Sequence, residues 1–159
     1  MALRNIVKMG DDVLRKVCRT QMTFDEKLWA LLDDMADTMY KAEGVGLAAP
    51  QIGILRRVCV IDIGEGLIEL VNPVIVKTSG KQVGSEGCLS IPGRFEEVER
   101  PFKVTVRAQN RHGENIELKG EGFLARAFCH EIDHLDGHLF TDNAIHILTP
   151  EEVKELKGE

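Results

Sequence analysis

The chain has 159 residues, of which 43% are hydrophobic and 29% are charged, and its formal net charge is −6. These values fit a globular protein with one core, and they argue against a nucleic-acid binder because the basic residues are scattered. No apolar run approaches the about 20 residues of a membrane helix, and residues 1–5 lack a signal or transit sequence, so we expect a cytoplasmic protein without membrane contact.

The first part of the chain is expected to be helical. Asp11 to Cys18 favours a short helical turn, and Thr23 followed three residues later by Glu26 is typical of a capping box that opens a helix. Leucine, methionine and alanine then recur at helical spacing until Gly44. Such a stripe could bind a partner, but packing against the core is the more common role, and we assign it to the core.

Residues 44–53 contain three glycines and a proline, and we expect a loop there. The segment lacks the motifs of a phosphate loop or a dinucleotide fold. Its small residues would instead let the backbone approach a strand or a ligand closely.

Strands are expected in the middle of the chain and a short helix at its end. Thr149, Pro150 and Glu152 form a second capping box, which predicts a tail helix to about Leu156. Strands grouped between helices predict an α+β fold with antiparallel or mixed sheets. The β-branched or alternating segments are residues 57–63, 67–76, 95–100, 103–108 and 115–118.

Residues 121–136 contain the pattern H-E-x-x-H in a segment that favours a helix. Four residues at 100° each bring His134 to within about 40° of His130, about 6 Å along the helix axis. Both imidazoles can therefore reach one metal ion. Two helix histidines can also meet by chance, because so short a pattern recurs in unrelated chains.

The helical wheel places Glu131 inside the apolar arc and Arg126 on the solvent side. A buried carboxylate is disfavoured unless a cation lies beside it or its pKa is raised. Either condition suits a residue that transfers protons.

A catalytic metal needs a third protein ligand, and Cys88 is a candidate. It lies in residues 84–92, where glycines and a proline let the backbone bend. A buried, inert cysteine would be the more common outcome. The remaining cysteines show no C-x-x-C spacing and are expected to pack in the interior: Cys18, Cys59 and Cys129.

Three segments in chain order resemble the peptide deformylase family: residues 44–51 (GVGLAAPQ), 86–90 (EGCLS) and 130–134 (HEIDH). The resemblance extends over nearly the whole chain. It implies a single catalytic domain over residues 1–159, with the sheets packed around the central metal-binding helix. It also implies removal of the formyl group from N-formylmethionyl nascent peptides.

The resemblance assigns roles to individual residues. It implies that Cys88, His130 and His134 hold the metal and that Glu131 moves the proton. The Gln51 amide and the Leu89 backbone N–H would stabilise the oxyanion. It points to Fe²⁺, although these ligands also suit Zn²⁺, Ni²⁺ and Co²⁺.

Substrate contacts follow from the same resemblance. The backbone of Val45 and Gly46 would pair with the extended substrate. The helical wheel places Phe123 and Ala127 next to His130, so these two residues, with Val45, are candidates to line the methionine pocket. Supporting ion pairs are expected among Glu43, Glu86 and Arg100. The tail lacks the basic helix that some relatives use at the ribosome, so transient ribosome association stays open.

Two alternatives remain at this level. An H-E-x-x-H metallopeptidase would cut internal peptide bonds, although a cysteine ligand speaks against it. A catalytically inactive metal-binding relative would use the ion only to hold the fold, although every catalytic position is present.

Overall fold

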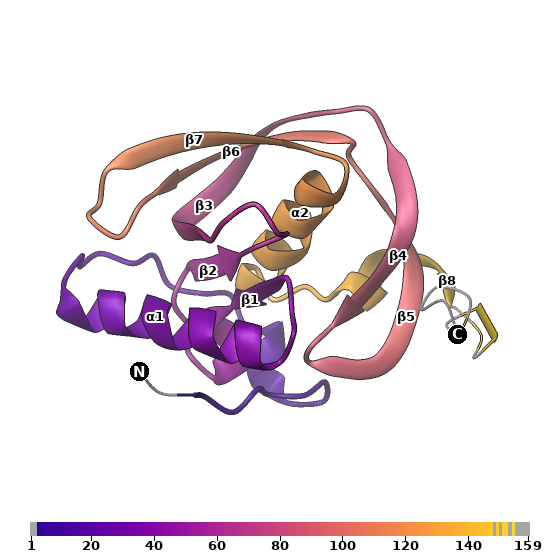
Figure 1. Ribbon diagram of the computed structural model, residues 1–159, viewed down its shortest axis with the longest axis horizontal. Coiled ribbons are helices and arrows are strands. Elements are labelled where there is room, and N and C mark those ends of the chain that lie inside the picture. The colour runs from indigo at the N-terminus through magenta and orange to yellow at the C-terminus, as the bar shows by residue number, and fades with distance from the viewer. Residues whose placement is uncertain (1–2, 148, 150, 153, 155–159) are drawn as a thin grey trace.

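The computed structural model describes residues 3–147, 149, 151, 152 and 154 (Figure 1). The α+β prediction is confirmed, because two long helices pack with two separate groups of strands. In chain order the elements are η1 (Asp12–Arg15), α1 (Glu26–Lys41), β1 (Gly46–Ala48), η2 (Ala49–Ile52), β2 (Val58–Ile61), β3 (Ile68–Ser79), β4 (Gln82–Cys88), β5 (Ile91–Arg100), β6 (Lys103–Gln109), β7 (Asn115–Glu121), α2 (Phe123–Leu135), η3 (Phe140–Asn143) and β8 (Ala144–Ile147).

The strands form two antiparallel sheets. One has the order β1-β2-β3-β6-β7 and the other the order β4-β5-β8. Helix α2 lies between them, with β6 and β7 on one side and the β4–β5 hairpin on another (Figure 1). Because β1 is at the edge of its sheet, it pairs with a strand, β2, on only one side of its backbone among the described residues.

The structure corrects two predictions about glycine-rich segments. Residues 44–53 are not a loop throughout, because Gly46–Ala48 pairs with β2 and Ala49–Ile52 forms a 3-10 helix. Residues 82–94 also belong mostly to the β4–β5 hairpin, which the sequence did not reveal. Glycine lowers strand propensity, but here pairing with a neighbouring strand determines the conformation.

The ends of both long helices differ from the prediction. Asp25, not Thr23, caps α1, since its side chain accepts a hydrogen bond from Leu28 N. Helix α2 starts at Phe123 because Glu121 is still paired in β7 and Gly122 turns the chain at φ 58°.

The predicted tail helix falls largely outside the described residues. In the part that is described, Thr149 and Glu152 exchange the two hydrogen bonds of the expected capping box.

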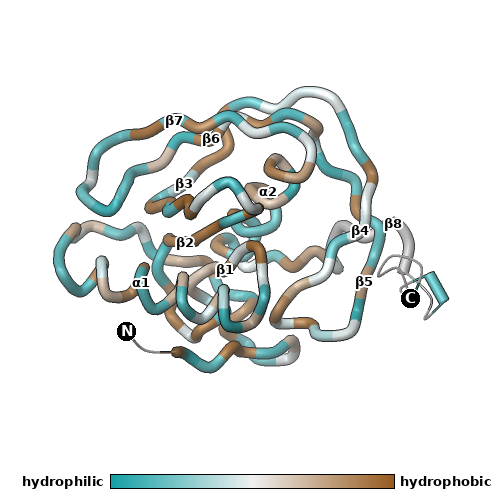
Figure 2. Tube along the Cα trace, in the orientation of Figure 1, coloured by the Kyte–Doolittle hydropathy of each residue, from teal (hydrophilic) through white to brown (hydrophobic). Residues whose placement is uncertain are grey.

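Of the three hydrophobic clusters among the described residues, two include residues of the long helices. The predicted stripe of α1 packs on β1 and β2, through Leu32, Met35 and Met39 among others. Phe128 and Ile132 of α2 pack on the larger sheet. In Figure 2 the hydrophobic colour follows β2, in the middle of the molecule. Among the described residues, no helix has both the length and the apolar character needed to cross a bilayer.

Candidate metal centre

Three potential metal ligands meet at the centre of the molecule. Cys88 ends β4, while His130 and His134 lie one turn apart on α2. One ligand atom from each of the three lies within 4.8 Å of the others, and Cys88 Sγ is 3.3 Å from His134 Nε2. One thiolate and two imidazoles around one point form a donor set that suits a divalent transition metal with an open coordination position.

The environment of the two imidazoles also fits a metal ion. His130 Nδ1 lies 2.9 Å from Glu86 Oε1, which directs the other ring nitrogen toward the centre. Burial lowers the pKa of His134 well below its usual value, so this ring stays neutral, as a ligand must be. Burial also opposes a charge on His130, but Glu131, Cys88 and Glu86 outweigh it and raise the pKa of His130. The anionic neighbours of His130 therefore favour a positive charge on that side of the site.

Glu131 lies beside this cluster and is almost fully buried. Its Oε2 is 3.9 Å from His130 Nε2, and its Oε1 has no hydrogen-bond partner among the described residues. Burial raises the pKa of Glu131 to about 7. Gly46 leaves room for this carboxylate, because a methyl group at that position would overlap it.

Gln51 approaches the cluster from η2 and is also buried. Its Oε1 accepts a hydrogen bond from Ala48 N at 2.9 Å. Its Nε2 lies 3.4 Å from Cys88 Sγ and 3.2 Å from Ser90 Oγ. The amide therefore turns its donor side toward the possible metal ligands.

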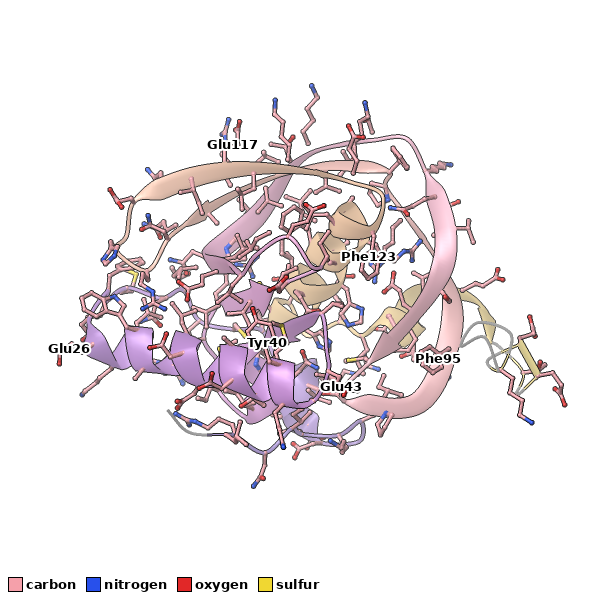
Figure 3. All side chains as sticks on the ribbon, viewed as in Figure 1. Glu26, Tyr40, Glu43, Phe95, Glu117 and Phe123 are labelled. Atoms are coloured by element: carbon pink, nitrogen blue, oxygen red, sulfur yellow. The ribbon has the colours of Figure 1, made fainter. Side chains whose placement is uncertain are left out.

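A cavity of about 410 Å³ opens in front of these groups. Phe123 on α2, Phe95 on β5 and Glu43 after α1, which Figure 3 labels, are among the residues that line it. The predicted contact residues Val45, Gly46, Phe123 and Ala127 all line it, as do Gln51, Leu89, His130 and Glu131.

Behind the metal ligands lies a buried ion network centred on Glu86. Arg100 donates two hydrogen bonds to its carboxylate, at 2.9 and 3.0 Å, and Arg126 donates one at 2.6 Å. Burial disfavours a charge on Glu86, but its hydrogen bonds to Arg100 and His130 outweigh that effect and lower its pKa to about 2. The expected Glu86–Arg100 pair is present, whereas Glu43 lies at the cavity rim and has no ion pair among the described residues.

The burial of Arg126 contradicts the helical-wheel prediction that its side chain faces solvent. Arg126 is only 5% exposed, although its position on α2 pointed to solvent. The β4–β5 hairpin covers that side of the helix, and Arg126 Nη1 also donates to the carbonyl oxygens of Gly84 and Val98. A helical wheel that assumes one buried face does not predict that a second face of the same helix is also covered.

Residues 3–149 match the family model described as polypeptide deformylase. The chain belongs to the polypeptide deformylase family. The predicted resemblance is thereby confirmed. Peptide deformylases from Caldicellulosiruptor bescii and Acetivibrio thermocellus are 57% and 56% identical to this chain; each alignment covers 99% of it, and respectively 95% and 92% of the relative.

Solved deformylase structures share the fold. The crystal structure of the peptide deformylase from Thermotoga maritima matches with a TM-score of 0.89 and 43% identity, over 91% of this chain and 99% of that one. The deformylase from Legionella pneumophila matches with a TM-score of 0.87 and 46% identity, over 99% and 96%. The sheets and helices described above therefore form a deformylase fold.

Two polar residues at this deformylase site were missed by the sequence analysis: Ser90, which contacts Gln51, and Arg126, which contacts Glu86. Ser90 lies within one of the three family segments, so that match was the available signal. Arg126 had none, because two of its partners, Gly84 and Glu86, come from β4, a strand that was not predicted.

Proposed function

We propose that Cys88, His130 and His134 bind one divalent metal ion and that Glu131 transfers the proton in hydrolysis of an N-formyl amide. The single observation that carries this proposal is the meeting of one thiol and two imidazoles within 4.8 Å, beside a buried carboxylate. As a polypeptide deformylase, the chain removes the formyl group from the N-terminal methionine of new polypeptides.

A divalent ion bound there would supply a Lewis acid that activates water and polarises the formyl carbonyl. Glu131 would take the proton from the attacking water and pass it to the leaving amine. A pKa of about 7 suits both transfers near neutral pH, because the group can bind and release a proton at little cost.

The Gln51 amide and the Leu89 N–H are proposed to donate hydrogen bonds to the oxyanion that develops on the formyl group. Gln51 Nε2 lies 3.4 Å from Cys88 Sγ, and Leu89 directly follows Cys88 in the turn between β4 and β5. Both donors therefore belong to residues next to Cys88.

The substrate is proposed to lie along the edge of β1. The backbone at Val45 and Gly46 would pair with the extended peptide, and Phe123 and Ala127 would contact the methionine side chain. Support comes from the position of β1 at the sheet edge and from the cavity that these residues line.

The proposal also covers the identity of the metal ion, the location of the protein in the cell and the bounds of the catalytic domain. We propose Fe²⁺ as the ion in cells, with Zn²⁺, Ni²⁺ or Co²⁺ as substitutes, because cysteine and histidine ligands suit all four. Action on nascent chains supports a cytoplasmic location and transient ribosome association. We also propose that residues 1–159 form one catalytic domain. The alternatives of an internal metallopeptidase and an inactive relative find no support in the relatives.

The test compares formyl-Met-Ala-Ser with acetyl-Met-Ala-Ser, using protein purified without oxygen and analysed for bound metal. We expect formate release from the first peptide and no hydrolysis of the second. Glu131→Ala should keep its metal and fold but lose at least about 10²-fold in kcat. Wild-type turnover by this variant would contradict the proposed proton transfer.

A further inference from the structure

The orientation of the Gln51 amide is fixed by its neighbours. Ala48 N donates to Oε1 at 2.9 Å, so the oxygen faces β1 and the NH₂ group faces the β4–β5 turn. An NH₂ group has two hydrogens to donate. Here one lies toward Ser90 Oγ at 3.2 Å and the other toward Cys88 Sγ at 3.4 Å. With one N–H bonded to Ser90, only the second N–H points to the reaction centre, where it lies against Cys88 Sγ.

Ser90 is held firmly enough to serve as a fixed acceptor. It is 0% exposed and lies in the two-residue turn between the paired residues Cys88 and Ile91. Its carbonyl oxygen accepts a hydrogen bond from Met9 N at 2.7 Å, and the Gln51 carbonyl accepts one from Val7 N at 2.7 Å. The N-terminal segment thus ties the turn of Ser90 and the 3-10 helix of Gln51 to each other.

We propose that Ser90 is a positioning residue for deformylation. Its hydroxyl engages one N–H of Gln51 and thereby aims the other N–H at the oxyanion. This inference rests on the proposed function, since it assumes that Gln51 is an oxyanion donor. Without the Ser90 hydroxyl, the Gln51 amide has no fixed hydrogen-bond acceptor on that side. The direction of its second N–H toward the reacting group is then less well fixed.

Steady-state kinetics of the metal-loaded enzyme on formyl-Met-Ala-Ser test this role through four proteins: wild type, Ser90→Ala, Gln51→Ala and the double variant. Loss of an oxyanion donor lowers kcat by about 10²–10³-fold. We expect about that loss for Gln51→Ala, and about a ten-fold loss for Ser90→Ala with KM unchanged, because the donor remains but is poorly aimed. The double variant should be no slower than Gln51→Ala. Ser79→Ala, at an exposed site, is the control.

A merely structural role predicts a different pattern. If the two losses multiplied in the double variant, or if Ser90→Ala kept wild-type kcat, the inference would be overturned. Metal content and the unfolding temperature of each variant show whether the site is intact. If wild type released no formate at all, the proposed function would fail instead.

A second measurement does not depend on the folding of Ser90→Ala. In ¹⁵N-resolved spectra of the wild-type protein, the side-chain NH₂ signals of Gln51 are identified by their loss in Gln51→Ala. We expect one of the two protons to exchange slowly with solvent, as a proton bonded to buried Ser90 must. Equal and fast exchange of both protons would refute the hydrogen bond on which the inference depends.

Discussion

Glu86→Gln should destabilise the protein and weaken metal binding together. The carboxylate accepts hydrogen bonds from Arg100 and Arg126 and contacts His130 Nδ1. Its pKa falls from 4.5 to about 2 on folding. At 1.36 kcal/mol per pH unit, that fall corresponds to about 3 kcal/mol. Breaking a buried ion pair costs about 3–5 kcal/mol, so both approaches give a similar loss of unfolding free energy.

The expected loss in unfolding temperature follows from this free energy. For a domain of this length, 1 kcal/mol shifts the midpoint by about 2–4 °C, which gives a fall of about 10 °C. Metal affinity should fall by about 10–100-fold, because His130 loses the anionic partner that orients it. Thermal unfolding of metal-free protein and titration with Zn²⁺ measure the two effects separately.

The pH dependence has a definite sign. Because folding lowers the pKa of Glu86, its stabilisation is complete above about 4.5 and is lost as the pH falls toward about 2. The wild type should therefore lose its advantage over Glu86→Gln in that window. Glu99→Gln, exposed on β5, is the matched control and should unfold like wild type. An unfolding midpoint of Glu86→Gln within 2 °C of wild type at pH 7 would refute the reasoning.

Three further predictions concern the same site. Glu131→Gln should stabilise the metal-free protein by about 3 kcal/mol at pH 8: folding raises the pKa of this buried carboxyl to about 7, so the wild type loses stability as the pH rises from 4.5 to 7. Equal denaturation midpoints of the two proteins at pH 8 would contradict this. Gly46→Ala should stay folded but lose about 10²-fold in kcat, because the added methyl displaces the Glu131 carboxylate. Circular dichroism checks the fold, and stopped-flow formate assays measure kcat. An unchanged kcat would show that the carboxylate has room beside the methyl group. Removal of the metal with a chelator should abolish activity, lower the unfolding temperature and be reversed by Fe²⁺ or Co²⁺; a chelated enzyme that still released formate would exclude the proposed metal role.

Local patterns determined the parts of this fold that depend on near neighbours in the chain. The α1 stripe from Leu28 to Met39 and the pairing of His130 with His134 follow from the helical period, which a sequence carries directly. Burial of Glu131 was predictable for the same reason, because it lies between apolar neighbours on one helix face.

Strand pairing could not be predicted in this way where glycines interrupt the pattern. Gly84 and Gly87 lie in β4, which is held by its partner β5 and not by its own propensity. The burial of Arg126 depends on the same missed hairpin. Propensity scales describe a segment alone, whereas these residues are ordered by contacts with residues distant in the chain.

The sequence alone predicted the family, the α+β class and the candidate metal ligands, because these follow from motifs and from the order of predicted elements along the chain. Only the tertiary structure decided that Cys88, more than forty residues before the histidines, lies within 4.8 Å of them, and that Ser90 faces Gln51. Distances between such segments are determined by how the β4–β5 hairpin packs on α2. That packing is the sum of many weak contacts, and no local pattern encodes it.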